Sequence, residues 1–502
     1  MMHGQNGQAL PLAIIALAIG SLVVAPFLGL AATDLIGSRV YGESISAQAA
    51  CEAGVAHAVW SLTRGDLPEE LPETGDSVTY QLDEAINGLT ASVTVTANAT
   101  GGGYGGDIAD AVIDTLEFDK SNCYEPDTIH VADEVYAAAY RGPGNDGFLK
   151  TVYIDSAGEI DSDVFDSLEF DGSDGYEPRI VHVSGGVYAI AYRGNDDDGF
   201  LKTVSIDADG AIHPVIDTLE FDTSDGYEPS IIRVSGDIFA VAYRGGSSRG
   251  YLKTVDIAAD GRIGDAIIDT LVFDSSACYE PSVINVAGSV FAIAYRGAGN
   301  DGFIKTVDIS PDGEIDNDIL DSLEFDNRNC REPDIIAVTG GIYAIVYRGT
   351  DNAGYLGTVS IDDSGNIGSV IDSFSFDSPG YEPDIINVSN DIYAVAYRGP
   401  GSDGYLKTVA ISAAGDIADS STDTLRFDAS GGYEPDIIRI SSGVFAIAYR
   451  GPGSDGFIKT AGITAGGGTA AYEIVAAAGG GTIRAFVNTA NATADIVSWQ
   501  YE

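Results

Sequence analysis

A glutamate and an arginine that could form an ion pair recur seven times along this chain. Each glutamate is followed by proline, and an arginine stands 16 positions after each glutamate. The pairs are Glu125/Arg141, Glu177/Arg193, Glu228/Arg244, Glu280/Arg296, Glu332/Arg348, Glu382/Arg398 and Glu434/Arg450. The two members of a pair lie equally far from the turn between them, so an antiparallel hairpin would place them side by side. We interpret the pairs as structural, with a ring of ligand-binding carboxylates around a channel as the alternative.

An aromatic residue precedes most of these glutamates and is the candidate ligand-binding group. The tyrosines at this position are Tyr124, Tyr176, Tyr227, Tyr279, Tyr381 and Tyr433, and Arg331 replaces tyrosine in the fifth copy. Tyrosine rings at an exposed surface could stack on sugar rings, and packing between repeats is the alternative use of the same residues. We predict that these six tyrosines bind a ligand on the face of the repeats that points away from the rest of the chain.

Acidic residues and lysines also recur at fixed positions. The aspartates that close each copy are Asp119, Asp171, Asp222, Asp274, Asp326, Asp377 and Asp428. The lysines of the third strand are Lys150, Lys202, Lys253, Lys305, Lys407 and Lys459, with Gly357 as the exception, and each is expected to pair with a neighbouring acid. Within Asn195-Asp-Asp-Asp-Gly199, Asp196 and Asp198 are candidate ligands for Ca²⁺. Ordinary turn formation is the alternative role of such Asp-Gly sequences.

Catalysis normally requires one constellation of base, nucleophile and orienting group. Here the polar residues are copied about seven times, and the five histidines show no metal-ligand spacing. We therefore predict that the protein has no catalytic residues and is not an enzyme. A hydrolase or lyase that works in a channel lined by the Glu/Arg pairs is an alternative. The fifth copy, with Arg331, Ala353 and Gly357, is where its asymmetry would lie.

Short strands must position these residues. Each copy contains four runs rich in β-branched and aromatic residues, bounded by Gly, Asp or Ser turns. The copies recur every 50 to 52 residues, and four strands in such a repeat are typical of a β-propeller blade. We predict a mostly β fold with a seven-bladed propeller of four-stranded blades. The last copy lacks a fourth strand, so residues 113–119 are expected to supply it and close the ring.

Composition and glycine-rich linkers divide the chain. We predict a transmembrane helix in residues 1–33, a helix and strands in 34–104, the propeller in 105–468, and strands in 469–502 that complete the sheet of the second segment. The apolar run from Leu10 to Ala32 is long enough to span a bilayer. The propeller is thus expected to be inserted into a surface loop of a host domain.

Two N-terminal motifs resemble a known family. Residues 7–22, Gly-Gln-Ala-Leu-Pro-Leu-Ala-Ile-Ile-Ala-Leu-Ala-Ile-Gly-Ser-Leu, and residues 49–62, which begin Ala-Ala-Cys-Glu-Ala-Gly-Val, resemble the N-terminal segment of PilX-like minor pilins and pilus-assembly proteins. The resemblance covers about residues 1–100. It implies a small α+β pilin-like domain in which a long N-terminal transmembrane helix packs against an antiparallel sheet. It also implies type IV pilus or envelope subunits as partners.

The net charge of −51 excludes nucleic acid as a plausible partner, because binding it requires neutralisation of phosphates. The sequence predicts a membrane-anchored protein exposed at the cell surface, which displays the propeller for adhesion to a glycan or a surface polymer. Repeated weak sites would add through avidity. A structural subunit of a pilus or envelope assembly, without any ligand, is the remaining alternative.

Overall fold

The computed structural model describes residues 50–51, 53–59, 61, 77–82, 85–87, 89–97, 106–464, 472–478, 481–488 and 495–501. The chain divides into two compact units. One unit is Tyr104–Gly466 and contains the repeats. The other combines Met1–Gly103 with Gly467–Glu502.

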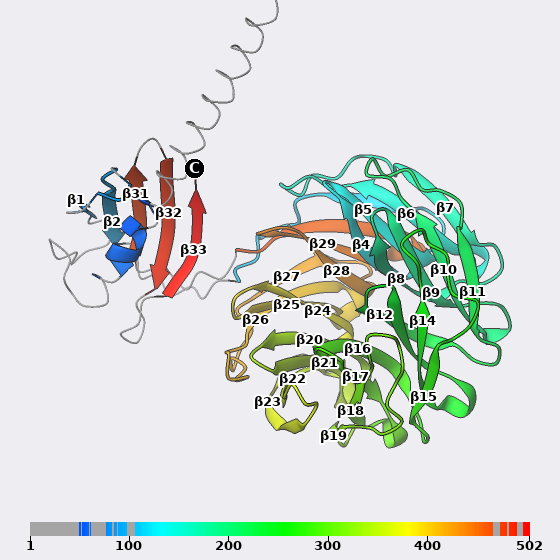
Figure 1. Cartoon of the computed structure of the whole chain (residues 1–502). Helices are drawn as coiled ribbons and strands as arrows, with labels where there is room; N and C mark the ends of the chain where they lie inside the picture. Colours follow the sequence, from blue (N-terminus) through cyan, green and yellow to red (C-terminus); the bar gives the residue numbers. More distant parts are fainter. Residues whose placement is uncertain are drawn as a thin grey trace, which may run out of the picture. The chain divides into compact units, whose positions relative to one another are not determined.

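The larger unit consists of seven four-stranded antiparallel sheets (Figure 1). The innermost strands are β4 (Tyr124–Ala132), β8 (Tyr176–Ser184), β12 (Tyr227–Ser235), β16 (Tyr279–Ala287), β20 (Arg331–Thr339), β24 (Tyr381–Ser389) and β28 (Tyr433–Ser441). The second strands are β5 (Val135–Arg141), β9 (Val187–Arg193), β13 (Ile238–Arg244), β17 (Val290–Arg296), β21 (Ile342–Arg348), β25 (Ile392–Arg398) and β29 (Val444–Arg450). Neighbouring innermost strands contact one another around the ring, and β28 contacts β4. The predicted seven-bladed propeller is confirmed.

The outer half of each blade follows the same order. The third strands are β6 (Gly147–Tyr153), β10 (Gly199–Ser205), β14 (Gly250–Asp256), β18 (Gly302–Asp308), β22 (Gly354–Ile361), β26 (Gly404–Ala410) and β30 (Gly456–Gly462). The fourth strands are β7 (Asp166–Asp171), β11 (Asp217–Asp222), β15 (Asp269–Asp274), β19 (Asp321–Asp326), β23 (Ile367–Asp377), β27 (Asp423–Asp428) and, in the seventh blade, β3 (Thr115–Asp119). The 3₁₀ turns between second and third strands are η1 (Pro143–Asn145), η2 (Asn195–Asp197), η3 (Gly246–Ser248), η4 (Ala298–Asn300), η5 (Thr350–Asn352), η6 (Pro400–Ser402) and η7 (Pro452–Ser454).

The ends of the propeller unit lie side by side. Strand β3 pairs with β30, so a strand from the start of the unit completes its last blade. Next to it, Ile108 and Ile463 form an antiparallel bridge. The backbone N–H of Gly106 also donates to the carbonyl of Thr464 at 2.9 Å. Adjacent ends are what an insertion into a surface loop requires.

The second strand of each blade explains how the blades pack. It is an almost continuously buried run, as in Val-Tyr-Ala-Ile-Ala-Tyr-Arg of β9. Successive side chains point to opposite faces, so alanines occupy one face and larger residues the other. Ala189 and Ala191 of β9 therefore meet the large face of the next blade, which includes Val241 and Tyr243. This small-against-large packing is repeated between the other blades.

The smaller unit contains one antiparallel sheet. Its strands are β1 (Ser77–Gln81), β2 (Ser92–Ala97), β31 (Tyr472–Ala478), β32 (Gly481–Asn488) and β33 (Asp495–Tyr501), in the order β1-β2-β31-β32-β33. Because β2 pairs with β31, the sheet joins segments on both sides of the propeller. Residues 50, 51, 53–59 and 61 are helical, and Cys51 and Val55 pack against Val93 and Ile474.

The structure corrects the predicted N-terminal architecture. No helix in the described residues is long and apolar enough to cross a membrane. The predicted span, residues 1–33, lies outside the described residues. The sequence predicts that a long transmembrane helix packs against the sheet, whereas the helical residues that the structure describes lie between 50 and 61. The predicted α+β pilin-like domain with a long transmembrane helix is therefore wrong, and the type IV pilus assignment loses its structural basis.

The inter-blade packing makes a stability prediction. Ala191 is fully buried against the next blade, so Ala191→Leu would overpack this joint. We expect a loss of about 1–3 kcal/mol in the free energy of unfolding, measured by urea denaturation. The matched control is Ala157→Leu in an exposed turn, which should leave the unfolding midpoint unchanged. Equal midpoints for the two variants would contradict the packing described here.

Candidate functional site

The Glu/Arg pairs lie at the start of the innermost strands, as side-by-side ion pairs within each blade. The shortest recorded distance between their charged atoms ranges from 2.7 to 3.2 Å across the seven pairs. In the second blade, Nε and Nη2 of Arg193 donate to the two carboxylate oxygens of Glu177, each at 3.2 Å. The structure thus places each glutamate beside its arginine on an antiparallel hairpin, as predicted.

Each of these glutamates also joins its blade to the next one. The backbone N–H of Glu228 donates to Oε2 of Glu177 at 2.8 Å, and Glu280 donates to Glu228 at 3.0 Å. Seven such hydrogen bonds, of 2.8 to 3.1 Å, run around the propeller, and Glu125 donates to Glu434 to close the ring. All seven glutamates have a φ of 50–52°, a left-handed conformation that side chains rarely adopt. The carboxylates are therefore used to connect blades.

Burial raises the pKa of some of these carboxyl groups. For Glu332 burial raises the pKa to about 7, and the nearby Glu280 and Glu382 add to this rise, whereas Arg348 opposes it. A raised pKa in the folded protein means that the contribution to stability is full below the ordinary pKa and is lost as the pH rises through about 7. Burial likewise raises the pKa of Glu125 and Glu280.

The six predicted tyrosines contact arginines of two blades. The Tyr227 ring centroid lies 3.9 Å from the guanidinium carbon of Arg244 in its own blade and 4.7 Å from that of Arg193 in the preceding blade. The other five rings make the same two contacts, at 4.1 to 5.1 Å. Cation–π contacts of this kind join neighbouring blades. Ligand binding by these tyrosines stays a prediction.

The aspartates that end the fourth strands hold the next blade in place. Asp171 accepts hydrogen bonds from the Tyr192 hydroxyl and the Lys202 ammonium, both at 2.6 Å. Lys202 also donates to the carbonyl of Phe170 at 2.7 Å. The same Asp–Tyr–Lys contact occurs with Asp119, Asp222, Asp274, Asp377 and Asp428. The predicted pairing of the recurrent lysines with neighbouring acids is present in the structure.

The candidate calcium ligands form a turn. Asp196 has a φ of 58° within η2, and its carboxylate accepts a hydrogen bond from the Asn195 amide at 2.8 Å. The backbone N–H of Asp198 donates to the Asn195 carbonyl. Within the described ranges, no three His, Cys, Asp or Glu residues come together so that they could hold a metal.

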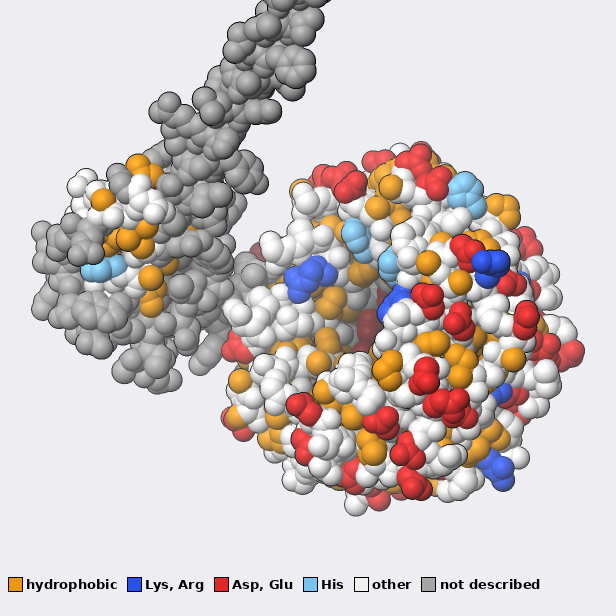
Figure 2. All heavy atoms as spheres, in the orientation of Figure 1, with side chains coloured by type: hydrophobic (Ala, Val, Ile, Leu, Met, Phe, Trp, Pro, Cys, Tyr) orange, Lys and Arg blue, Asp and Glu red, His pale blue; other side chains and the backbone are white. Residues whose placement is uncertain are grey.

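One cluster that the sequence analysis did not single out lies on the inner strands. The position two residues after each ring glutamate is occupied by Asp127, Arg179, Ser230, Ser282, Asp334, Asp384 and Asp436. We call these seven residues the axial cluster. Unlike the neighbouring positions of the repeat, this position holds different residue types in different blades. That difference is the signal in the sequence from which the cluster could have been found. Figure 2 shows a recess in the centre of the propeller unit with acidic side chains in its depth.

Hydrogen bonds connect the axial cluster around the inner strands. Arg179 donates to Asp127 at 3.0 Å, and the Ser282 hydroxyl donates to Asp334 at 3.0 Å. Asp384 accepts the backbone N–H of Ile437 at 2.7 Å. Arg179 also interacts electrostatically with Asp384 and Asp436, which belong to distant blades. Four carboxyl groups therefore face a single guanidinium.

Burial, together with the neighbouring negative charges, raises the pKa of three aspartates of this cluster. Burial raises the pKa of Asp384 well above its ordinary value, and Asp334 and Asp436 add to the rise. Burial and the charge of Asp127 raise the pKa of Asp436 to about 7, although Thr128 and Arg179 oppose the rise. The carboxyl groups of Asp384 and Asp334 are hydrogen-bonded to each other, and burial raises the pKa of Asp334 as well. A cation that entered the cluster would relieve this repulsion.

Comparisons with known proteins give no family. No family model matches the chain, and no curated protein matches it. Solved structures do resemble it. A candidate 6-phosphogluconolactonase from Bacteroides fragilis is 13% identical over 76% of this chain and 98% of its own, with a TM-score of 0.47. The WD40 domain of Toxoplasma gondii coronin is 10% identical over 79% and 88% of the two chains, with a TM-score of 0.48. Neither similarity assigns an activity to this chain.

The fourth-strand aspartates predict a loss of stability in acid. Burial raises the pKa of Asp171, but hydrogen bonds from Lys202, Tyr192 and Ser173 outweigh it and lower the pKa to about 2. Asp119, Asp222 and Asp428 are lowered to about 2 in the same way. Because these folded-state values lie below the ordinary 3.8, the stabilisation is present above pH 4 and is lost as the pH falls through about 2.

The check is urea unfolding between pH 5 and pH 2. We expect Asp171→Asn to lower the unfolding midpoint at pH 5 and to make its decline toward pH 2 less steep than in the wild type. Asp161→Asn, which removes an exposed carboxylate from an outer connection, should leave both features unchanged. A decline that is equally steep in Asp171→Asn would contradict the assignment.

Proposed function

We propose that the propeller is a binding module that holds a positively charged ligand at the axial cluster. The proposal rests on one observation. The residue two positions after each ring glutamate differs from blade to blade, and there four carboxyl groups face one arginine. The copied Glu, Arg, Tyr, Asp and Lys residues are occupied in contacts between blades. A binding site for a distinct ligand requires residues that differ from blade to blade, and the axial cluster supplies them.

The electrostatics of the cluster favour a cation. Raised pKa values at Asp384 and Asp436 mean that their charged forms are destabilised by burial and by each other. A bound ammonium or guanidinium group would stabilise these charges, and the protons that they hold would be released. The net charge of −51 would raise the local concentration of cations around the chain.

Among the predicted ligands, an amine-bearing glycan or surface polymer is the one whose charge fits. An array of amino sugars presents one ammonium group per residue, spaced along a chain, which suits a recess lined with carboxylates. This proposal keeps the predicted adhesive function and moves the binding site from the tyrosines to the axial cluster. It does not involve a membrane anchor.

A second candidate function follows from the direct contact between the carboxyl groups of Asp334 and Asp384. Two carboxyl groups in direct contact are the arrangement that aspartic proteases use for acid–base hydrolysis. The predicted hydrolase or lyase alternative would therefore be placed at this pair. Release of shorter products from a bound polymer would distinguish hydrolysis or elimination from binding.

The binding proposal predicts a preference between two matched probes. A deacetylated glucosamine oligomer carries ammonium groups at pH 6, and its N-acetylated counterpart is neutral. We expect the full chain to bind the deacetylated oligomer and not the acetylated one in isothermal titration calorimetry. Asp384→Asn should weaken binding about tenfold or more, because it removes a desolvated charge that would contact the cation.

The control variant is Asp161→Asn, which removes one negative charge at an exposed position away from the cluster. It should bind like the wild type. Equal losses in the two variants would indicate attraction by the overall charge and would refute a specific site. Equal binding of the two oligomers would refute recognition of the ammonium group.

A further inference from the structure

The interfaces between blades contain a site that binds a primary ammonium group, and six lysines show its geometry. In each of six interfaces, Nζ of the third-strand lysine lies 2.6 to 3.1 Å from Oδ2 of the preceding blade's last aspartate. The same nitrogen donates to the carbonyl of the phenylalanine before that aspartate, at 2.5 to 2.8 Å. The site is thus a carboxylate oxygen and a carbonyl oxygen that face one ammonium.

The interface between the fourth and fifth blades keeps this site but lacks its ammonium. Gly357 stands where the other blades have lysine, whereas Phe325 and Asp326 are retained. Tyr347 still donates its hydroxyl to Oδ2 of Asp326 at 2.9 Å. Among the described residues, no lysine or arginine forms an ion pair with Asp326, whereas each of its six equivalents pairs with a lysine. The carboxylate therefore lacks the cation that its six equivalents have.

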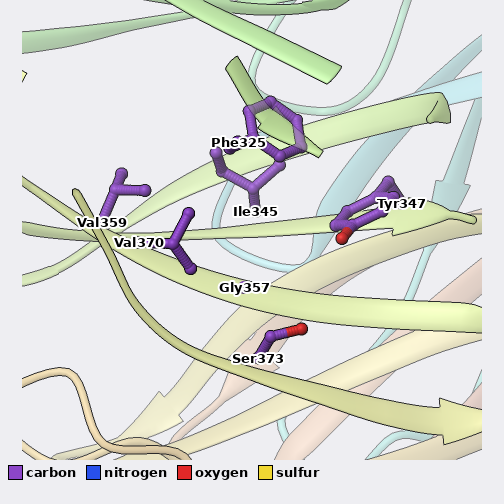
Figure 3. A pocket seen from close by; sticks show the side chains of 7 residues that line it. All are labelled: Phe325, Ile345, Tyr347, Gly357, Val359, Val370 and Ser373. Carbon is purple, nitrogen blue, oxygen red and sulfur yellow. The ribbon is translucent and has the colours of Figure 1, made fainter. Parts of the chain in front are cut away.

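The space of the missing lysine is a cavity. It has a volume of about 20 Å³ and is lined by Phe325, Ile345, Tyr347, Gly357, Val359, Val370 and Ser373 (Figure 3). In Figure 3 the hydroxyl groups of Tyr347 and Ser373 lie on either side of Gly357. A volume of this size accommodates one particle as large as a water molecule. Asp326 does not itself line the cavity, but it follows Phe325 in the sequence and accepts a hydrogen bond from Tyr347, and both of these residues line it.

Packing does not require glycine at position 357. A Cβ atom built on Gly357 would meet only the carbonyl oxygen of Asp372, at 3.9 Å, which is an ordinary contact. The residue pairs regularly with Ile345 and Ser373 in the middle of β22, where glycine weakens a strand. The backbone would therefore accept a lysine, and the substitution leaves both a void and an uncompensated carboxylate.

We propose that this interface binds a small monovalent cation of ammonium size, which takes the position that the lysine Nζ occupies in the other six. The ligands are Oδ2 of Asp326 and the carbonyl oxygen of Phe325. An ammonium ion fits both their chemistry, because the six lysines present the same donor to the same acceptors, and the volume of the cavity. This site is separate from the axial cluster and does not depend on the proposed function.

Thermal unfolding of the full chain at constant ionic strength tests the proposal. Ammonium chloride should raise the Tm in a saturable manner, by about 1–3 °C relative to tetramethylammonium chloride, because a ligand that binds only the folded state stabilises it. Gly357→Lys supplies the missing ammonium, so it should raise the Tm in tetramethylammonium chloride and abolish the response to ammonium. Asp326→Asn should abolish the response without supplying a cation.

The second blade offers a matched variant. Lys202→Gly creates the same vacancy beside Asp171, so it should lower the Tm and gain a response to ammonium. Three results would overturn the proposal: equal Tm values of the wild type in ammonium and tetramethylammonium salts, a response that persists in Gly357→Lys, or a response in Lys202→Gly with none in the wild type. Each would show that ammonium does not act through the cavity beside Gly357.

Discussion

The propeller depends on a single repeated interaction, in which a glutamate carboxylate is shared between an arginine of its own blade and the backbone N–H of the next glutamate. The carboxylate is largely withdrawn from water, and a buried charge is costly unless it is paired and hydrogen-bonded. Both partners are therefore needed in every blade. This explains why the Glu-Pro and Arg positions have no exception in seven copies, whereas the tyrosine and lysine positions each have one.

The same reasoning separates residues that build the ring from residues that can bind a ligand. Ala191 against Tyr243, Tyr227 against Arg193, and Asp171 against Lys202 each cross from one blade to another. Such contacts must recur because every interface between blades has the same geometry. The axial cluster and Gly357 differ from the repeated pattern. At both places, carboxyl groups lack enough positively charged partners. Both proposed ligand sites therefore lie where the sequence differs from the repeated pattern.

The repeat period and the strand pattern were sufficient to predict the propeller and its closing strand. The side-by-side placement of each glutamate and arginine also followed from their equal distance to a turn. The hydrogen bond from one glutamate to the next blade could not be predicted, because it depends on a left-handed backbone conformation at Glu177 and its equivalents. The axial cluster could not be predicted either, because Asp127 and Asp436 stand more than 300 residues apart in the sequence and come together only when the ring closes.

The N-terminal prediction failed for a different reason. Apolar composition and amphipathic spacing are local signals, and they do not show where one helix ends and another segment begins. In the described residues the helical segment is held by the sheet that it covers, through Cys51 and Val55 against Val93. The tyrosines illustrate the same limit, since an aromatic residue next to a loop predicts a ligand as readily as it predicts a partner from the next blade.

The most direct test is to measure the free energy of unfolding for seven single Glu→Gln variants, one for each ring glutamate. If the carboxylates join the blades, all seven variants should lose stability, by about 1–3 kcal/mol where a charged hydrogen-bond acceptor is lost and by less at Glu332, whose pKa is raised to about 7. Residues that are kept for function tend to be neutral or stabilising when they are replaced. One or more variants that matched or exceeded the stability of the wild type would contradict a structural role for the ring.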